Sequence, residues 1–243
     1  MATSMGGLSR RLAERYLAAM SRPALTALLL AALAALGTPA AAPGERPASG
    51  FEGSVEPLSP SLRERMTGSS WREGCPVGLG ELRLVRVSHW DFRGNVERGE
   101  LVVHERYAAG IVDVMRRLFA KRFPIRRMEL IDRYGADDRR SMAHDNTSAF
   151  NCRFVAGTTR WSMHAYGKAI DVNPRENPYV AGDHVSPPEG APYADRRPAR
   201  DGMIFRDGPV VRSFARIIGW EWLGAPSSGR SYRDYQHLSA DGT

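Results

Sequence analysis

The sequence lacks the features of cysteine-rich, membrane-spanning and repeat proteins. It has two cysteines, Cys75 and Cys152. One isolated pair argues against a cysteine metal site, and in an exported chain it favours a single disulfide; two free buried thiols are the alternative. The longest apolar run, residues 24–36, is short for a bilayer span. We find no internal repeat.

Lysine is scarce, and arginine carries almost all the positive charge. Lysines occur only at Lys121 and Lys168, whereas the formal net charge is +7. The arginines are scattered among acidic residues and form no basic run, which argues against a nucleic-acid partner. A net positive charge favours an anionic environment such as a cell wall.

The first 42 residues are typical of an export signal. Four arginines between positions 10 and 22 precede the apolar run 24–36, and the alanines at 40–42 would permit cleavage. An uncleaved N-terminal anchor is the alternative. We do not expect a lipid anchor, because the sequence has no cysteine near position 42. We therefore expect a secreted or extracytoplasmic protein, with no membrane span once the signal is removed.

The rest of the chain divides by composition. Residues 43–70 are rich in Pro, Ser, Gly and Glu without clear periodicity, which predicts a mostly disordered linker. Residues 71–243 suit one folded domain. We expect this domain to be a monomer.

Hydrophobic periodicity predicts a mixture of helices and strands without regular alternation, hence an α+β fold. Apolar residues recur at three- and four-residue steps in two segments that we expect to be helices, 105–122 and 210–218. Residues 137–143 suggest a polar turn or a short helix, and residues 174–202 a long loop. The expected strands are 82–87, 100–104, 128–131, 149–154, 168–172 and 234–238.

Two short segments hold the residues that suit metal chemistry, SMHAYGKAID at 162–171 and DYQH at 234–237. His164, Asp171 and His237 offer two imidazoles and one carboxylate, the inventory of a zinc hydrolase with three protein ligands and one open position. The seven-residue spacing of His164 and Asp171 fits a loop that enters a strand, with a tight bend at Gly167. Taken singly, each of the three would more often be an ordinary structural residue.

The combined pattern Ser-x-His-x-x-Gly-x-Ala-x-Asp and Asp-x-x-His resembles the zinc D-alanyl-D-alanine carboxypeptidases and the related L-alanyl-D-glutamate endopeptidases of phage lysins. These enzymes share a fold with the Hedgehog signalling domain. The resemblance covers roughly residues 75–240 and implies a small antiparallel sheet flanked by helices, with a zinc site. Further matching segments are 146–153, 173–174, 177–179 and 219–222.

The resemblance also implies roles for single residues. His164, Asp171 and His237 would bind Zn²⁺, and Asp234 would be the general base. Arg153 would face the scissile carbonyl or the substrate carboxylate; a salt bridge within the fold is the alternative.

Three further residues are implied to bind substrate: Ser162, Asn177 and Tyr179. A capping role for Ser162 and a structural turn at Asn177 and Tyr179 are the alternatives. The chain departs from the family pattern after the last histidine, at Leu238 and Ser239, which leaves substrate preference open.

The resemblance thus implies a zinc metallopeptidase that hydrolyses peptidoglycan stem peptides, foremost as a D-alanyl-D-alanine carboxypeptidase. An L-alanyl-D-glutamate endopeptidase and a D-Ala-D-Ala dipeptidase are alternatives within the family. A non-catalytic, zinc-containing domain that binds the cell wall is an alternative from another class.

Overall fold

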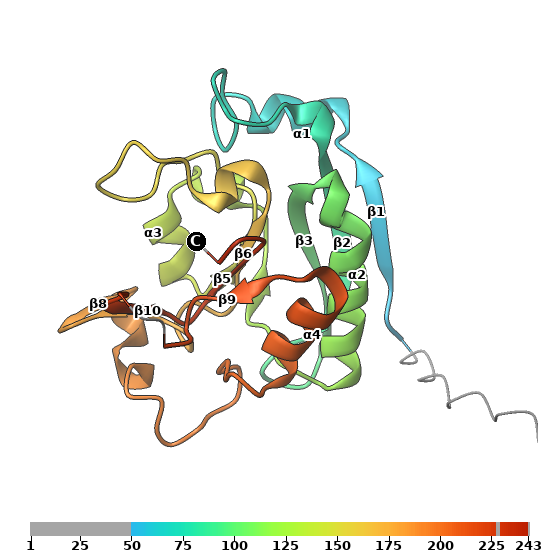
Figure 1. Cartoon of the computed structure of the whole chain (residues 1–243). Coiled ribbons are helices and arrows are strands. Elements are labelled where there is room, and N and C mark those ends of the chain that lie inside the picture. Colours follow the sequence, from blue (N-terminus) through green and yellow to red (C-terminus); the bar gives the residue numbers. More distant parts are fainter. Residues whose placement is uncertain (1–49, 227–228, 243) are drawn as a thin grey trace, which may run out of the picture. The chain divides into compact units, whose positions relative to one another are not determined.

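The largest sheet has three antiparallel strands in the order β1-β2-β3 (Figure 1). This computed structural model describes residues 50–226 and 229–242, so the predicted signal at 1–42 lies outside the described residues. The strands are β1 (Gly53–Pro57), β2 (Leu82–Trp90) and β3 (Val96–His104). The predicted strands 82–87 and 100–104 are therefore confirmed and extended.

The sheet buries both of its faces. Side chains alternate along a strand, so Val85 and Val87 of β2 enter the larger apolar core, whereas Leu82 and Leu84 enter a second core on the opposite face. Helix α2 supplies the first core, and the short helix α1 supplies the second. This double cover is the reason that β2 carries apolar residues on both of its faces.

Two amphipathic helices pack against each other beside this sheet (Figure 1). Helix α2 (Glu105–Ala120) begins where the His104 side chain accepts a hydrogen bond from the Arg106 amide, and it buries its apolar face. Helix α4 (Pro209–Ile218) ends at Gly219, which adopts a left-handed conformation with φ of 73°. Both helices were predicted from their periodicity and are confirmed.

The remaining elements are short. Two further three-stranded sheets are antiparallel, and one strand pair, β4 with β5, is parallel. The sheets are β10-β7-β8, with β7 (Tyr179–Ala181), β8 (His184–Ser186) and β10 (Tyr232–Asp234), and β6-β11-β9, with β6 (Ala169–Asp171), β9 (Glu221–Trp222) and β11 (His237–Ser239). The parallel pair is β4 (Arg127–Met128) and β5 (Asn146–Thr147). The helical turns are α1 (Pro60–Met66), α3 (Asp138–Ala143), η1 (Leu79–Glu81), η2 (Ile131–Tyr134), η3 (Met163–Tyr166) and η4 (Pro188–Tyr193).

The α+β class is confirmed, although several small sheets replace the single sheet expected. The predicted linker 43–70 is wrong from residue 50 onward, because β1 pairs with β2 and α1 is ordered. Ser59 caps α1 by accepting a hydrogen bond from the Leu62 amide, and Leu62 and Met66 are buried one turn apart. A seven-residue helix is too short to show periodicity in sequence.

Three other predictions of local structure are corrected. Residues 149–154 form no strand, because their amides bond to different partners: Phe150 to the Val102 carbonyl and Cys152 to that of Ser70. The expected loop 174–202 contains the β7–β8 hairpin and η4. The expected strand 234–238 is two strands, since β10 pairs with β7 whereas β11 pairs with β6 and β9.

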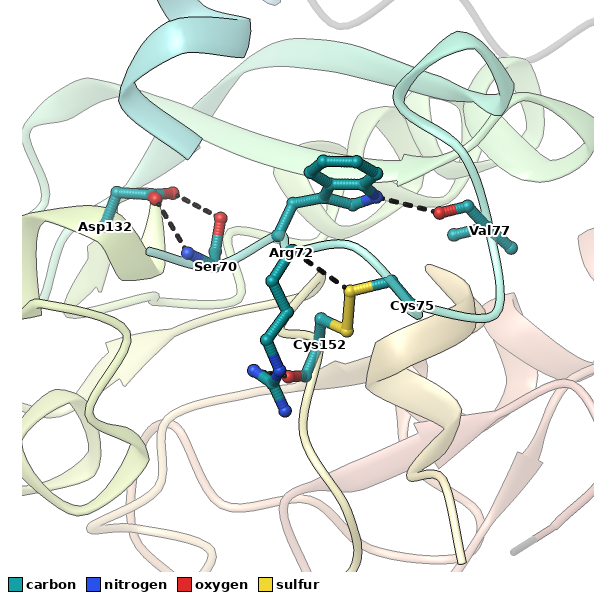
Figure 2. Close-up of a disulfide and its surroundings, with 7 residues drawn as sticks. Ser70, Arg72, Cys75, Val77, Asp132 and Cys152 are labelled. Carbon is teal, nitrogen blue, oxygen red and sulfur yellow. Dashed lines mark hydrogen bonds between the residues drawn. A yellow bond between two sulfur atoms is a disulfide. The ribbon is translucent and has the colours of Figure 1, made fainter. Parts of the chain in front are cut away.

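A disulfide joins Cys75 to Cys152, as predicted, with the Cα atoms 6.0 Å apart (Figure 2). The surrounding segment is held by hydrogen bonds: Arg72 donates to the Cys152 carbonyl over 2.7 Å, and the Ser70 hydroxyl donates to Asp132 over 2.9 Å. Disulfides persist mainly in oxidising compartments, so this bridge favours an extracytoplasmic location. Among the described residues, no helix has the length and apolar character needed to cross a bilayer.

Candidate metal centre

Two of the three predicted metal ligands lie on paired strands. In the antiparallel pair of β6 and β11, Asp171 stands directly opposite His237, so both side chains point to the same face. The adjoining residues Ile170 and Leu238 point the other way and are completely buried in the larger core. Burial of two such aliphatic side chains contributes about 3–6 kcal/mol in total, which anchors the strands that carry the ligands.

The third predicted ligand, His164, comes from the helical turn η3. Gly167 ends this turn with φ of 65°, and the chain then enters β6. A Cβ atom at position 167 would lie 2.6 Å from the backbone nitrogen of His104. The expected tight bend is therefore confirmed, and glycine is required both for its conformation and for the close approach.

The three side chains converge on one point. His164 Nε2 lies 3.1 Å from Asp171 Oδ2, and His237 Nδ1 lies 2.9 Å from Asp171 Oδ1. The two imidazole nitrogens are 3.2 Å apart. All three residues are buried, and their ligand atoms form a group that could hold a metal ion. The predicted convergence of these three residues is confirmed.

A hydrogen bond on the far side of the ring orients His164. Its Nδ1 lies 2.5 Å from the carbonyl oxygen of Ala149, an atom that can only accept. Nδ1 must therefore carry the proton, which leaves the lone pair of Nε2 directed at the other two ligands. Such an arrangement is typical of a metal-binding histidine.

The charges within the group favour an ionised Asp171. Burial alone would raise the pKa of this carboxyl, but the two histidines outweigh burial and hold its pKa well below the usual range. His237 shows the reciprocal effect: burial lowers its pKa, and the hydrogen bond and charge of Asp171 raise it above the ordinary value. An ionised carboxylate beside two imidazoles is a set of side chains that can bind a divalent cation, which would replace the proton that His237 otherwise holds.

Asp234 lies in the same cavity, at the end of β10. Its Oδ1 is buried and has no hydrogen-bond partner among the described residues. Burial, together with repulsion from Asp171, raises the pKa of Asp234 to about 6, and the charge of His237 partly offsets this. A carboxyl with a pKa near neutrality suits proton transfer. Its action as a base stays a prediction.

Arg153 lines this cavity and also forms a salt bridge. Its Nη2 lies 2.8 Å from Asp138 Oδ2, the internal pairing that was the alternative for this residue. Its Nε is buried without a hydrogen-bond partner in the described structure, and both Arg153 and Asp138 border the cavity. The salt bridge therefore positions the guanidinium at the cavity.

The three predicted substrate residues have different outcomes. Ser162 borders the cavity, but its hydroxyl also caps η3 by accepting from the His164 amide over 3.3 Å. Tyr179 borders the cavity and packs against Tyr232, with ring centres 5.2 Å apart. Burial and the charge of Asp234 raise the Tyr179 pKa.

The prediction that Asn177 binds substrate is wrong. It is completely buried and its amide is fully occupied by the protein. It donates to the Gly202 carbonyl over 2.8 Å and accepts from the Ile204 amide over 2.6 Å and from Arg196 over 3.0 Å. Asn177 thus joins the start of the 174–202 segment to its end.

The cavity has a volume of about 540 Å³, enough for a short peptide. Sequence reasoning missed Gln236, whose Oε1 is buried there without a hydrogen-bond partner in the described residues. It also missed Met142, which supplies apolar wall and contacts the Gln236 amide through sulfur at 3.5 Å. Position 236 lies between Asp234 and His237 in the Asp-x-x-His motif. This position within the motif was the signal that could have identified Gln236.

Part of the chain matches a known protein family. Residues 156–240 match the D-alanyl-D-alanine carboxypeptidase family. This segment is a domain of that family, which implies the Hedgehog/DD-peptidase fold. The matched range contains the three metal-binding candidates and Asp234, whereas Arg153 and the disulfide lie before it. Neither a search of curated proteins nor one of solved structures gave a significant match. Family and buried triad together indicate a metallopeptidase.

Proposed function

We propose that this protein is an exported zinc peptidase that hydrolyses peptidoglycan stem peptides, foremost as a D-alanyl-D-alanine carboxypeptidase. The observation that carries the proposal is the convergence of His164, Asp171 and His237 in one cavity with Asp234. A structural metal site would be closed, whereas this group borders an open cavity that holds further unpaired polar atoms.

The donor set supports zinc as the metal. Two imidazoles and one carboxylate are a common catalytic zinc set, and ligand atoms in a tetrahedral zinc site lie about 3.3 Å apart. The two imidazole nitrogens are 3.2 Å apart, and each lies 2.9–3.1 Å from one of the two Asp171 oxygens, so a single ion could contact all three side chains. Zinc held there would supply Lewis acidity, polarising a carbonyl and making water more acidic.

The protein's own groups supply the remaining chemistry. Asp234 takes a proton from the attacking water and returns it to the leaving amine, a task for which its raised pKa is suited. The Arg153 guanidinium, held at the cavity by Asp138, donates to the developing oxyanion or to the substrate's terminal carboxylate. Tyr179 and Tyr232 form an aromatic wall against which the peptide packs.

The proposed site of action is outside the cytoplasm. The disulfide supports it, as do the arginine-rich start and apolar run within residues 1–42. Peptidoglycan stem peptides are found in the same compartment as such a protein.

Mass spectrometry of a synthetic stem pentapeptide incubated with purified, zinc-loaded protein tests the proposal. We expect loss of one terminal alanine. Asp234→Asn should lower kcat by about 100-fold or more, since a general base contributes roughly 10²–10⁴ in rate. Asp183→Asn, at an exposed hairpin position, is the matched control and should retain full activity.

The same digest separates the alternatives. Cleavage after L-alanine would identify an endopeptidase, and turnover of free D-Ala-D-Ala alone would identify a dipeptidase. Tight binding of the pentapeptide without any turnover would instead favour the wall-binding domain. An unchanged kcat in Asp234→Asn would remove this residue from the mechanism.

A further inference from the structure

The turn at residues 234–237 carries two groups of the candidate site, and a residue outside the cavity contacts this turn. Asp234 and His237 border the cavity, whereas Tyr235 between them does not. The guanidinium of Arg196 lies over the Tyr235 ring, 4.3 Å from its centre, and Arg196 does not border the cavity either. The contact between Arg196 and Tyr235 therefore supports the turn from outside the cavity.

Arg196 donates three hydrogen bonds within the segment 174–204. Its Nη1 donates to the Glu176 carbonyl over 2.6 Å, and its Nη2 donates to the Asn177 side-chain oxygen over 3.0 Å and to the Ile204 carbonyl over 2.7 Å. The planar guanidinium thus joins both ends of a segment that includes the β7–β8 hairpin at the cavity. An ammonium group has no planar fork and could not reproduce this set of bonds.

Arg196 has a conformation and an environment that are unfavourable by themselves. Its φ is 62°, in the left-handed region that residues with a side chain rarely adopt. Burial lowers the pKa of the guanidinium to about 10, although the charges of Tyr235 and Asp195 act in the opposite direction. A strained and partly desolvated residue persists where its surroundings hold it, and such residues gather near functional sites.

The backbone of Tyr235 is fixed as well. Its amide donates to the Pro178 carbonyl over 3.3 Å, and the Trp222 indole donates to the Tyr235 carbonyl over 2.8 Å. Pro178 follows Asn177 directly, so the contacts of Arg196 with Asn177 and Tyr235 and the Tyr235–Pro178 hydrogen bond form a closed ring. A closed ring of contacts limits how far the turn can shift relative to β7.

We propose that Arg196 is a positioning residue for the candidate site, which acts through Tyr235 to hold Asp234 and His237 in place beside the β7–β8 hairpin. The inference rests on the proposed peptidase function, since it concerns the geometry of that reaction. A displacement of about 1 Å can cost about 100-fold in rate, even when the altered residue lies outside the site. Arg196 thus influences proton transfer by Asp234 and metal binding by His237 from outside the cavity.

Four variants, compared at a temperature at which all are folded, test this proposal. Arg196→Met and Tyr235→Leu each remove one partner, and each should lower kcat for the stem pentapeptide by roughly 10- to 100-fold, with a smaller change in KM. The double variant should be no slower than the slower single variant, because both changes break one contact. Tyr235→Phe keeps the ring and should restore most of the activity that Tyr235→Leu loses.

Zinc affinity gives a second readout that needs no substrate. Competition with a chelator should show roughly tenfold weaker zinc binding in Arg196→Met, because residues that orient a ligand tune its affinity for the metal. If the parent binds zinc but leaves the pentapeptide intact, the proposed function fails, and this comparison still tests the role of Arg196.

Arg200→Met is the matched control. Arg200 belongs to the same segment and lies over the Tyr193 ring at 4.9 Å, but it does not border the cavity. This control should keep the kcat and the zinc affinity of the parent. Arg196→Lys keeps the charge without the planar fork and should give an intermediate loss, so it carries the test if Arg196→Met does not fold.

Two results would overturn the proposal. A lower melting temperature in Arg196→Met, with kcat and zinc affinity unchanged, would make Arg196 a purely structural residue. Additive losses in the double variant would show that Arg196 and Tyr235 act separately.

Discussion

Reduction of the Cys75–Cys152 disulfide should destabilise the protein by about 4 kcal/mol. The bridge closes a loop of 77 residues. Closing a loop of this length lowers the entropy of the unfolded chain, which corresponds to about 4.5 kcal/mol at 25 °C. For a chain of this size the melting temperature should fall by roughly 10–15 °C. Residual structure in the unfolded state would reduce this value.

Loss of the disulfide should also perturb the candidate active site. Arg153 follows Cys152 directly, and the Cys152 carbonyl accepts from Arg72. A looser Cys152 would weaken the pairing of Arg153 with Asp138 at the cavity. We therefore expect the reduced protein to lose peptidase activity already at temperatures below its unfolding transition.

Denaturant unfolding with and without reductant measures the loss of stability, and cleavage of the stem pentapeptide at temperatures below the unfolding transition measures the loss of activity. The double variant Cys75→Ala, Cys152→Ala should resemble the reduced parent and should not respond further to reductant. An unchanged unfolding midpoint with an unchanged m-value would refute the reasoning from loop closure.

Two other predictions concern bound metal and pH. Chelation should lower the melting temperature and added zinc should restore it, because a ligand that binds only the folded state stabilises it. His237→Ala should abolish this response in thermal unfolding, whereas His184→Ala should retain it. Burial and repulsion from Asp145 raise the pKa of Glu176 to about 8. The folded state then holds a proton that the unfolded chain releases, so stability should fall from about pH 4.5 to pH 8. Glu176→Gln should flatten this dependence in chemical unfolding, and an equally steep profile would contradict the assignment.

The sequence predicted the long helices and the metal group because short segments carry their patterns. Helices α2 and α4 bury one face, so their apolar residues recur at helical spacing. The bend at Gly167 fixes the spacing of His164 and Asp171 within one segment. The pairing of β6 with β11 then brings His237 from a second segment, 66 residues beyond Asp171, and periodicity does not predict that contact.

The errors arose where distant contacts decide the structure. Residues 50–70 have the composition of a linker, but β1 is held by β2 and Phe51 packs against Phe119 across 5.5 Å. Asn177 lies in a segment that resembles the family. Its side-chain amide, however, forms hydrogen bonds with the backbone of Gly202 and Ile204, 25 and 27 residues further along the chain. Neither pairing leaves a periodic signal in the sequence.

The two carboxylates of the cavity show how one site can provide two functions. Asp171 lies beside His164 and His237, and these two histidines hold its pKa low despite burial. Asp234 is half-buried, and its Oδ1 is enclosed without a hydrogen-bond partner in the described structure, so burial raises its pKa to about 6. In hydrolases, different surroundings can separate the pKa values of two carboxyl groups. One group then stays ionised while the other transfers protons. The turn at Tyr235 and Gln236 creates this difference, because it places Asp234 on β10 and His237 on β11. A single continuous strand through these residues would have turned Asp234 and His237 toward opposite faces, and the cavity would have lost its second carboxylate.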